Sequence, residues 1–353
     1  MNYLPQVRPI AIVFFVSSLL LSMLLNVEGQ EIGNEKEPVQ LRNQRSYNLL
    51  FLQFAPETSD VLPKGRSRLS IQLDIANNLL IPSPVLGAKV IEDFETQRLQ
   101  FGWRKGISNG NEIEVFLPVI WRNGGVLDGI LNAYHRFINF KANQEDDPAG
   151  RNSVGEYHSA WKLIDADGKI LVDQRGAIGF GDLELSLKHA FNSRRQRGAT
   201  AIRFGIKLPT GNSKSLLGSG GADTGFSFDS RYRVGRDFTF YFNLGGVLTG
   251  RTNALPNRES ALWQSFFGAE YHPNHRDSYF AQVDWSSPAV RTGNHFADGL
   301  SVTALFGYKR EVSKNTILSV AFAENGDIHN YKIPALSSIG PDLTLSFAIA
   351  WKR

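Results

Sequence analysis

Hydrophobic and polar residues alternate one by one in many short stretches of the chain. In the closing stretch, 343–351, Leu, Leu, Phe, Ile and Trp occupy every second position, with small or weakly polar residues between them. Successive side chains of a β-strand point to opposite faces, so this pattern predicts a strand with one apolar face. With the closing stretch included, stretches of this kind cover 68–77, 98–104, 112–121, 181–191, 201–211, 224–232, 238–246, 263–271, 279–285, 299–309, 316–324 and 343–351.

The connections between these stretches alternate in length. The short ones are 105–111, 192–199, 234–236, 272–277 and 310–315, and the long ones are 77–97, 122–177, 210–223, 249–259, 287–298 and 326–341. Barrels of the bacterial outer membrane have short turns on the periplasmic side and longer loops outside. We therefore predict an all-β fold, a transmembrane antiparallel β-barrel of about 12 strands, with 14 as the alternative. The apolar stretch 47–54 has no place in this scheme.

The polar faces of the expected strands carry charges of both signs. A charged side chain facing lipid at the membrane midplane costs roughly 2–4 kcal/mol, so such residues are expected to point into the barrel. We interpret them as candidates for the lining of a lumen or pore: Asp74, Glu114, Asp182, Glu184, Lys188, Arg203, Lys207, Asp229, Arg231, Asp284 and Lys309.

The first thirty residues have the pattern of a secretory signal peptide. A basic residue, Arg8, precedes an apolar run from Ile10 to Leu25, and small residues precede Gln30. This pattern predicts cleavage after residue 29 and export to the Gram-negative outer membrane, with an uncleaved anchor as the alternative. Residues 30–45 are polar and unpatterned and are expected to form a flexible leader. The barrel domain is then expected to span 46–353.

Composition narrows the classes of function. The chain has no cysteine, which excludes disulfides and thiolate metal sites. A net charge of +4 is too small and too dispersed to indicate nucleic-acid binding. No nucleotide loop or serine-hydrolase motif is found, and we expect neither a cofactor nor a metal. The expected partners are outer-membrane lipids and lipopolysaccharide, the barrel-assembly machinery and an unknown small-molecule solute.

The longest connection, 122–177, is expected to contain structure of its own. Apolar residues at helical spacing in 126–140 predict a short helix, and "WKLIDADGKILVD" predicts a hairpin. Loops of this length are often functional, so the connection is either an extracellular cap or a plug that closes the barrel mouth. Asp128, Tyr134 and His135 are the candidates for plug residues. Asp128 and His135 could also form an acid–base pair, although a structural hydrogen bond is the commoner role.

Several segments together resemble a known family. They are "GFGDLELSLKHAF", "IRFGIKLPTG", "LGSGGADTGFSFDSRYRV", "PDLTLSFAIAWKR" and "GGVLDGILNAYHRFINF". Their combination is similar to an uncharacterised family of Gram-negative outer-membrane β-barrels, catalogued as domain of unknown function 3187. The resemblance covers roughly residues 75–353 and implies the barrel fold, but it brings no established activity.

Three functions are compatible with these observations. The first is a passive, porin-like channel or small-molecule transporter that the long loop closes. The second is a lipid-modifying barrel enzyme, for which His189 on an apolar strand face would be the relevant residue. The third is a structural or adhesive barrel. The absence of an identifiable nucleophile favours the channel, so we predict that the protein is not an enzyme.

Overall fold

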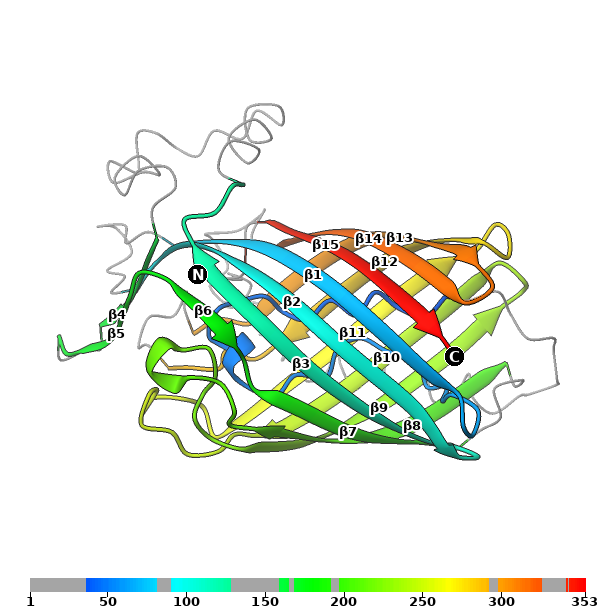
Figure 1. Ribbon diagram of the computed structural model, residues 1–353, viewed down its shortest axis with the longest axis horizontal. Helices are drawn as coiled ribbons and strands as arrows, with labels where there is room; N and C mark the ends of the chain where they lie inside the picture. The colour runs from blue at the N-terminus through cyan, green and yellow to red at the C-terminus, as the bar shows by residue number, and fades with distance from the viewer. Residues whose placement is uncertain are drawn as a thin grey trace, which may run out of the picture.

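The chain forms a closed antiparallel β-barrel, shown in the computed structural model of Figure 1. The structure describes residues 36–80, 90–127, 159–164, 168–191, 197–291, 298–325, 341 and 343–353. Within these ranges twelve strands make the barrel, as predicted. They are β1 (Ser67–Leu80), β2 (Val90–Ser108), β3 (Asn111–Asn123), β7 (Leu183–Ala190), β8 (Gly198–Leu208), β9 (Asp223–Val234), β10 (Phe238–Leu248), β11 (Ala261–Tyr271), β12 (Asp277–Ser286), β13 (Ser301–Ser313), β14 (Thr316–Asn325) and β15 (Leu343–Lys352).

The barrel closes where its first and last strands meet. β1 pairs antiparallel with β15, with Leu69 opposite Trp351 and Asn77 opposite Leu343. A sheet inside hydrocarbon must bond every backbone N–H and C=O internally, which only a closed sheet achieves. The closing strand therefore needs an apolar outer face along the bilayer. Phe347 on that face is 44% exposed, whereas its neighbour Ser346 points inward and is buried.

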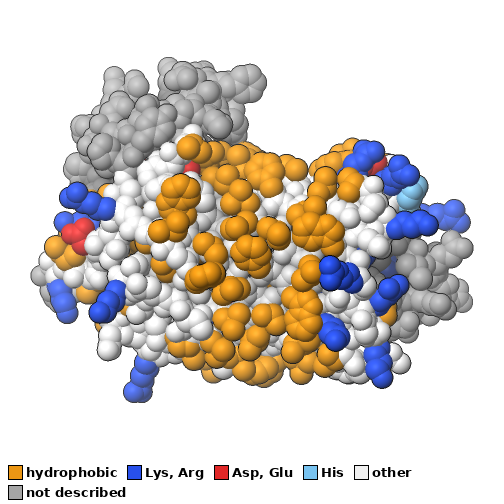
Figure 2. All heavy atoms as spheres, in the orientation of Figure 1, with side chains coloured by type: hydrophobic (Ala, Val, Ile, Leu, Met, Phe, Trp, Pro, Cys, Tyr) orange, Lys and Arg blue, Asp and Glu red, His pale blue; other side chains and the backbone are white. Residues whose placement is uncertain are grey.

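Side chains alternate between lipid and lumen along the strands. In β9 the burial alternates almost residue by residue, with Phe226 and Phe228 exposed and Ser227 and Asp229 buried. Figure 2 shows the result on one face of the molecule: hydrophobic side chains cover the middle of the barrel, and Lys and Arg side chains gather toward its ends. This distribution is that of a membrane-spanning barrel, with an apolar band between charged rims.

Short and long connections lie at opposite ends, as the sequence indicates. Short turns join β2–β3, β7–β8, β9–β10, β11–β12 and β13–β14, and the other connections are longer. The end with the short turns is called the short-turn end below, and the opposite end is called the long-loop end. The described residues contain no helix long and apolar enough to cross a membrane.

The described part of the 122–177 connection contains three short strands. β4 (Ala160–Ile164) and β5 (Ile170–Gln174) form the expected hairpin. β4 pairs with the first residues of β2, at the long-loop end of the barrel. β6 (Ala177–Phe180) pairs with β3 at Val119–Arg122, nearer the long-loop end than the residues of β3 that pair with β7. The helix expected within 126–140 lies outside the described residues, as do Asp128, Tyr134 and His135.

The clearest difference from the sequence-based expectation concerns residues 36–45. They were expected in a flexible leader ahead of the barrel, but they lie buried inside it. Strand patterning could not reveal this, because the segment is held by side-chain contacts to the inner wall and not by a ladder of backbone hydrogen bonds. Val39, for example, donates its backbone N–H to the side chain of Gln282, at 2.7 Å.

The lipid-facing surface generates a first testable prediction. Phe306 lies in the middle of β13 and is 64% exposed, so we expect Phe306→Arg to reduce the free energy of unfolding in phospholipid vesicles by about 2–4 kcal/mol. Urea unfolding followed by tryptophan fluorescence would measure this change. Phe306→Leu, which keeps the surface apolar, is the control and should change stability far less; equal losses for the two variants would argue against lipid contact at this position.

Candidate functional site

Residues 36–66, called the lumenal segment below, pass through the barrel interior before β1 begins. Figure 1 shows this part of the chain as a blue trace running inside the strands. Its first pass starts at the short-turn end, where the backbone N–H of Lys36 donates to Glu270, near the end of β11 (2.7 Å). The pass reaches the long-loop end at Asn43, whose side chain donates to Ser286, the last residue of β12 (2.6 Å).

The second pass returns to the short-turn end. The backbone N–H of Leu52 donates to Asp223, the first residue of β9, at 2.9 Å. Further along, the backbone N–H of Leu62 donates to Glu112, the second residue of β3, at 2.7 Å. The lumenal segment therefore follows a U-shaped path that enters and leaves the barrel at the same end.

The bend of the U packs under an apolar cap at the long-loop end. It contains the 3-10 helix η1 (Asn48–Leu50), preceded by Tyr47. The Tyr47 ring lies 5.0 Å from the ring of Trp161 in β4, and the Arg122 guanidinium lies 4.3 Å above the same Trp ring. Phe51 and residues from several of the long loops complete this buried cluster. The apolar stretch 47–54, which had no place among the strands, is thus the part that closes the mouth.

Phe54 lies in a recess that glycines leave in the barrel wall. A Cβ atom at Gly205, Gly225 or Gly245, on neighbouring strands β8, β9 and β10, would come within 3.0 Å of the Phe54 ring. The Arg203 guanidinium lies 5.2 Å from the same ring. Three glycines facing inward on adjacent strands have room for an aromatic ring because none of them carries a side chain. The wall is shaped to receive the lumenal segment at this point.

Glu57 is the centre of a buried charge cluster. Its carboxylate bonds Lys188 at 2.6 Å and Arg203 at 2.6 Å, and it also pairs with Arg104. Burial alone would raise the pKa of Glu57, but the charges of Arg104, Lys188 and Arg203 outweigh it and lower the pKa below its ordinary value. The carboxylate is therefore ionised at neutral pH and anchors the segment to three strands.

The other two carboxylates of the lumenal segment have similar partners. Glu37 pairs with Arg68 and, at 3.1 Å, with Arg104. Asp60 lies 3.0 Å from Arg231 and 4.0 Å from Arg233. Removing one member of a buried ion pair leaves the other charge without compensation, which usually costs several kcal/mol. These contacts hold the return pass of the segment and its entrance at the short-turn end.

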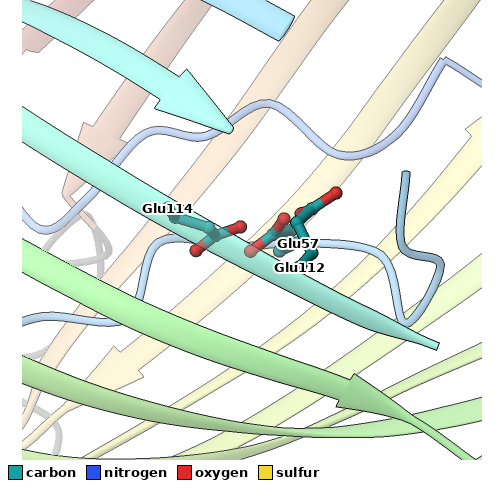
Figure 3. A group of neighbouring side chains, drawn as sticks. All are labelled: Glu57, Glu112 and Glu114. Atoms are coloured by element: carbon teal, nitrogen blue, oxygen red, sulfur yellow. The ribbon is translucent and has the colours of Figure 1, made fainter. Parts of the chain in front are cut away.

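Three glutamates come close enough together to suggest a cation site. Carboxylate oxygens of Glu57, Glu112 and Glu114 lie within 4.8 Å of one another, and Figure 3 shows Glu57 of the lumenal segment beside Glu112, with Glu114 further along β3. Arg104 and Lys188 already lie among them: Arg104 is 2.6 Å from Glu112, and Lys188 is 3.4 Å from it. A metal ion would have to displace these side chains, so the cluster fits an internal ion-pair network better than a metal centre.

The structure places the predicted lining residues on the inner side of the wall. Asp284 is partly buried, and the other candidates are buried; these are Asp74, Glu114, Asp182, Glu184, Lys188, Arg203, Lys207, Asp229, Arg231 and Lys309. Several of them contact the lumenal segment directly: Glu184 bonds Arg42 at 2.5 Å, and Lys309 donates to the carbonyl oxygen of Pro38 at 2.7 Å. As lining of an open pore they remain a prediction.

Narrow spaces lie beside the lumenal segment. Two of them flank Phe54, with volumes of about 360 and 260 Å³ when the space open to solvent is included. Asp284 lines the larger space, and Glu114 and Glu184 line the smaller. In this conformation the described lumen is therefore filled mainly by the protein itself.

Sequence reasoning missed part of this site. Arg104 and Glu112 lie at the ends of the predicted stretches 98–104 and 112–121 and obey the same alternation as the predicted candidates, so the alternation alone indicates their inward position. Glu37, Glu57 and Asp60 carry no such signal, because charged residues in an irregular stretch look the same in a lumen as in solvent. The glycines that surround Phe54 were the remaining clue, since glycine inside a strand often marks a close approach.

His189, the residue considered for an enzyme, lies on the outer face near the short-turn end. Its Nδ1 atom lies 2.9 Å from the side-chain oxygen of Asn111, and its ring meets Phe191 edge-on at 5.1 Å. The Asn111 amide nitrogen donates to the hydroxyl of Ser108 at 2.6 Å. A serine nucleophile needs its hydroxyl within hydrogen-bond reach of the imidazole. Here Ser108 and His189 each bond Asn111 instead, which is a structural arrangement.

Together, the closed apolar-belted cylinder and its charged interior define a β-barrel of the outer-membrane type. The chain belongs to the family described as "Protein of unknown function (DUF3187)", which it matches over residues 16–336. The resemblance noted in the sequence is thereby confirmed. No match is found among curated proteins.

The chain is similar to solved structures that are described as an outer membrane channel and as porins. The COG4313 outer membrane channel from Pseudomonas putida F1 is 11% identical, with a TM-score of 0.56, and the match covers 85% of this chain and 100% of that one. The NanC porin is 7% identical with a TM-score of 0.44, covering 80% and 98%. The KdgM porin is 7% identical with a TM-score of 0.41, with the same coverage. At these identities the likeness to the COG4313 channel shows the fold alone.

The glycine recess generates a second prediction. A leucine at position 205 would occupy the space of the Phe54 ring, so we expect Gly205→Leu to displace the lumenal segment while leaving the barrel closed. Trypsin cleavage after Arg42 and Arg45 in detergent micelles, followed by mass spectrometry, should become faster by about tenfold or more, because proteolysis follows the population of the open form. Gly246→Leu is the matched control, since a Cβ there meets nothing within 4 Å, and its cleavage rate should equal that of the wild type.

The lowered pKa of Glu57 generates a third prediction. Its contribution to docking of the segment should be complete above the ordinary carboxyl pKa of 4.5 and be lost as pH falls toward the lowered value. We expect ¹⁹F NMR of a trifluoromethyl-phenylalanine at position 54 to show the docked environment at pH 7 and a growing displaced signal in acid.

Glu57→Gln provides the test of this assignment. It should weaken docking by about 3–5 kcal/mol at neutral pH, because Arg104, Lys188 and Arg203 lose a buried partner. Glu259→Gln at the long-loop end, where Glu259 pairs with the exposed Arg291, is the control and should keep the wild-type spectrum. A docked signal in Glu57→Gln at every pH would contradict the role assigned to Glu57.

Proposed function

We propose that the protein is a passive channel or small-molecule transporter of the Gram-negative outer membrane, closed at rest by its own lumenal segment. The observation that carries this proposal is that the segment fills the lumen without being part of the barrel sheet. Apart from one isolated backbone bridge, Lys64 to Gly106, no described residue of the segment pairs with a strand. Its displacement would therefore leave the hydrogen-bonded cylinder intact.

The kind of contact also supports a movable segment. The segment is bound largely through ion pairs and polar side chains, for which water or a polar solute can substitute once the lumen is hydrated. A barrel of twelve strands lies between those filled by wall side chains and those with wide aqueous pores. With the segment displaced, the inward-facing charges predicted from the sequence would line a polar path.

The long connection 122–177 has a supporting role in this proposal. Its β4–β5 hairpin packs on the bend of the segment through Trp161 and Leu163, so we expect it to stabilise the closed state from the outside. We expect Asp128, Tyr134 and His135 to act in the same loop, although the segment and not the loop supplies the plug within the described residues.

The proposal includes the remaining expectations from the sequence. The short-turn end faces the periplasm and the long loops face outward, as in outer-membrane barrels generally. We expect residues 1–29 to direct export and to be removed, as their sequence pattern predicts. The barrel-assembly machinery, lipids, lipopolysaccharide and a small-molecule solute are the expected partners.

A reversible cross-link tests the proposal. The chain has no cysteine, and a Cβ atom at Gly307 would lie 2.7 Å from the Cγ2 atom of Val39, close enough for a disulfide in the double variant Val39→Cys/Gly307→Cys. In planar bilayers we expect the oxidised double variant, combined with Glu57→Gln to favour opening, to carry a current at least about tenfold below that of its reduced form.

The single-cysteine variants, also combined with Glu57→Gln, are the controls and should conduct regardless of oxidation. The proposal would be overturned by equal currents in the oxidised and reduced double variant. It would equally be overturned if no variant conducted, although the ¹⁹F signal at position 54 showed the segment displaced.

A further inference from the structure

The inner wall places like charges directly opposite one another on neighbouring strands. Arg68 of β1 is the register partner of Arg104 of β2, and Lys188 of β7 is the register partner of Arg203 of β8. Like charges directly opposite on one face of a sheet destabilise it. These pairs are buried, so solvent does not screen their repulsion, and each pair needs an anion close by.

The lumenal segment supplies one carboxylate to each pair. Glu37 pairs with both Arg68 and Arg104. Glu57 pairs with both Lys188 and Arg203. A third case lies within one strand, where Arg231 and Arg233 of β9, two positions apart on the inner face, share Asp60. The wall therefore contains three sites in which two cations converge on one carboxylate.

These sites form one continuous band. The strands β1, β2, β3, β7, β8 and β9 are consecutive neighbours in the sheet. The cations lie in the halves of their strands near the short turns, except Arg203, which lies at the midpoint of β8. The wall acids in this band are Glu112, Glu114 and Asp229, fewer than the cations that flank them. When the segment withdraws, the band is left with an excess of positive charge.

The charges in the opposite half of the lumen are arranged differently. There the segment contributes a cation, Arg42, to the wall acid Glu184, while the wall acids Asp74, Asp182 and Asp223 pair with the wall cations Arg98 and Lys207. The paired cations that depend on the segment's carboxylates thus lie toward the short-turn half. A solute that binds there has to bring carboxylates to the positions that Glu37, Glu57 and Asp60 occupy.

We propose that the transported solute is a small carboxylate-bearing anion, which competes with the lumenal segment for the paired cations of this band. Transport of the anion rests on the proposed function, whereas the anion-binding sites do not depend on it. Binding of the anion stabilises the displaced segment, because the same cations cannot hold both carboxylates. The segment is in this sense an internal competitor of the solute.

Binding is tested first, with citrate as the probe and the detergent-solubilised full-length protein. Isothermal titration should show saturable citrate binding to the wild type, and Asp60→Asn should bind it at least about fivefold more tightly, because the segment then competes less well. Asp237→Asn, in an exposed turn, is the control and should bind as the wild type does. Arg231→Gln/Arg233→Gln should bind more weakly than the wild type, although it also loosens Asp60.

Conductance separates this inference from the proposed function. Citrate added on the short-turn side should raise the open probability in planar bilayers, and NaCl at equal ionic strength or the trication spermidine should not. Citrate binding without any conductance would support the anion sites and contradict the channel. The anion sites would be overturned if citrate left the conductance unchanged and either did not bind or bound the wild type and Asp60→Asn equally. The channel proposal would then still hold.

Discussion

The requirement that every backbone hydrogen bond be made inside the sheet determines the rest of this molecule. It closes the first strand on the last and makes the outside of every strand apolar. It also encloses a space from which lipid is excluded, and polar side chains have nowhere else to point. The lumen is therefore charged because the exterior cannot be. The charged side chains that point into it need hydrogen-bond and ion-pair partners, which either water or protein can provide.

In this protein the N-terminal part of the chain meets that need. Its carboxylates bond Arg104, Lys188 and Arg203 among others, its aromatic ring fills a recess bounded by glycines, and its bend sits beneath Trp161. None of these contacts belongs to the backbone hydrogen-bond ladder that closes the sheet. The ladder can therefore stay closed when the segment leaves, although the wall cations then lose their partners, and this is what the proposed movable plug requires.

The fold could be predicted from the sequence because its signal is repeated. Twelve stretches of alternating residues and the alternation of short and long connections both indicate an antiparallel barrel, and both were confirmed. The inward position of residues such as Lys188 and Arg231 followed from that alternation. The lumenal segment could not be found in this way, because extended chain held by side chains has no period. Residues 36–45 were assigned to a leader on polarity alone, although a polar environment exists on both sides of the wall.

The U-shaped course of the lumenal segment has a topological consequence. Both arms of the U emerge at the short-turn end, where β1 begins and β15 ends. Within the described residues, the segment therefore leaves no chain end at the long-loop end. In the proposed mechanism the described segment is inserted or withdrawn as a doubled-over loop, and the seam between β1 and β15 stays closed while it moves. Closure of the cylinder and filling of its interior are then independent events, and the interior can be emptied and refilled repeatedly.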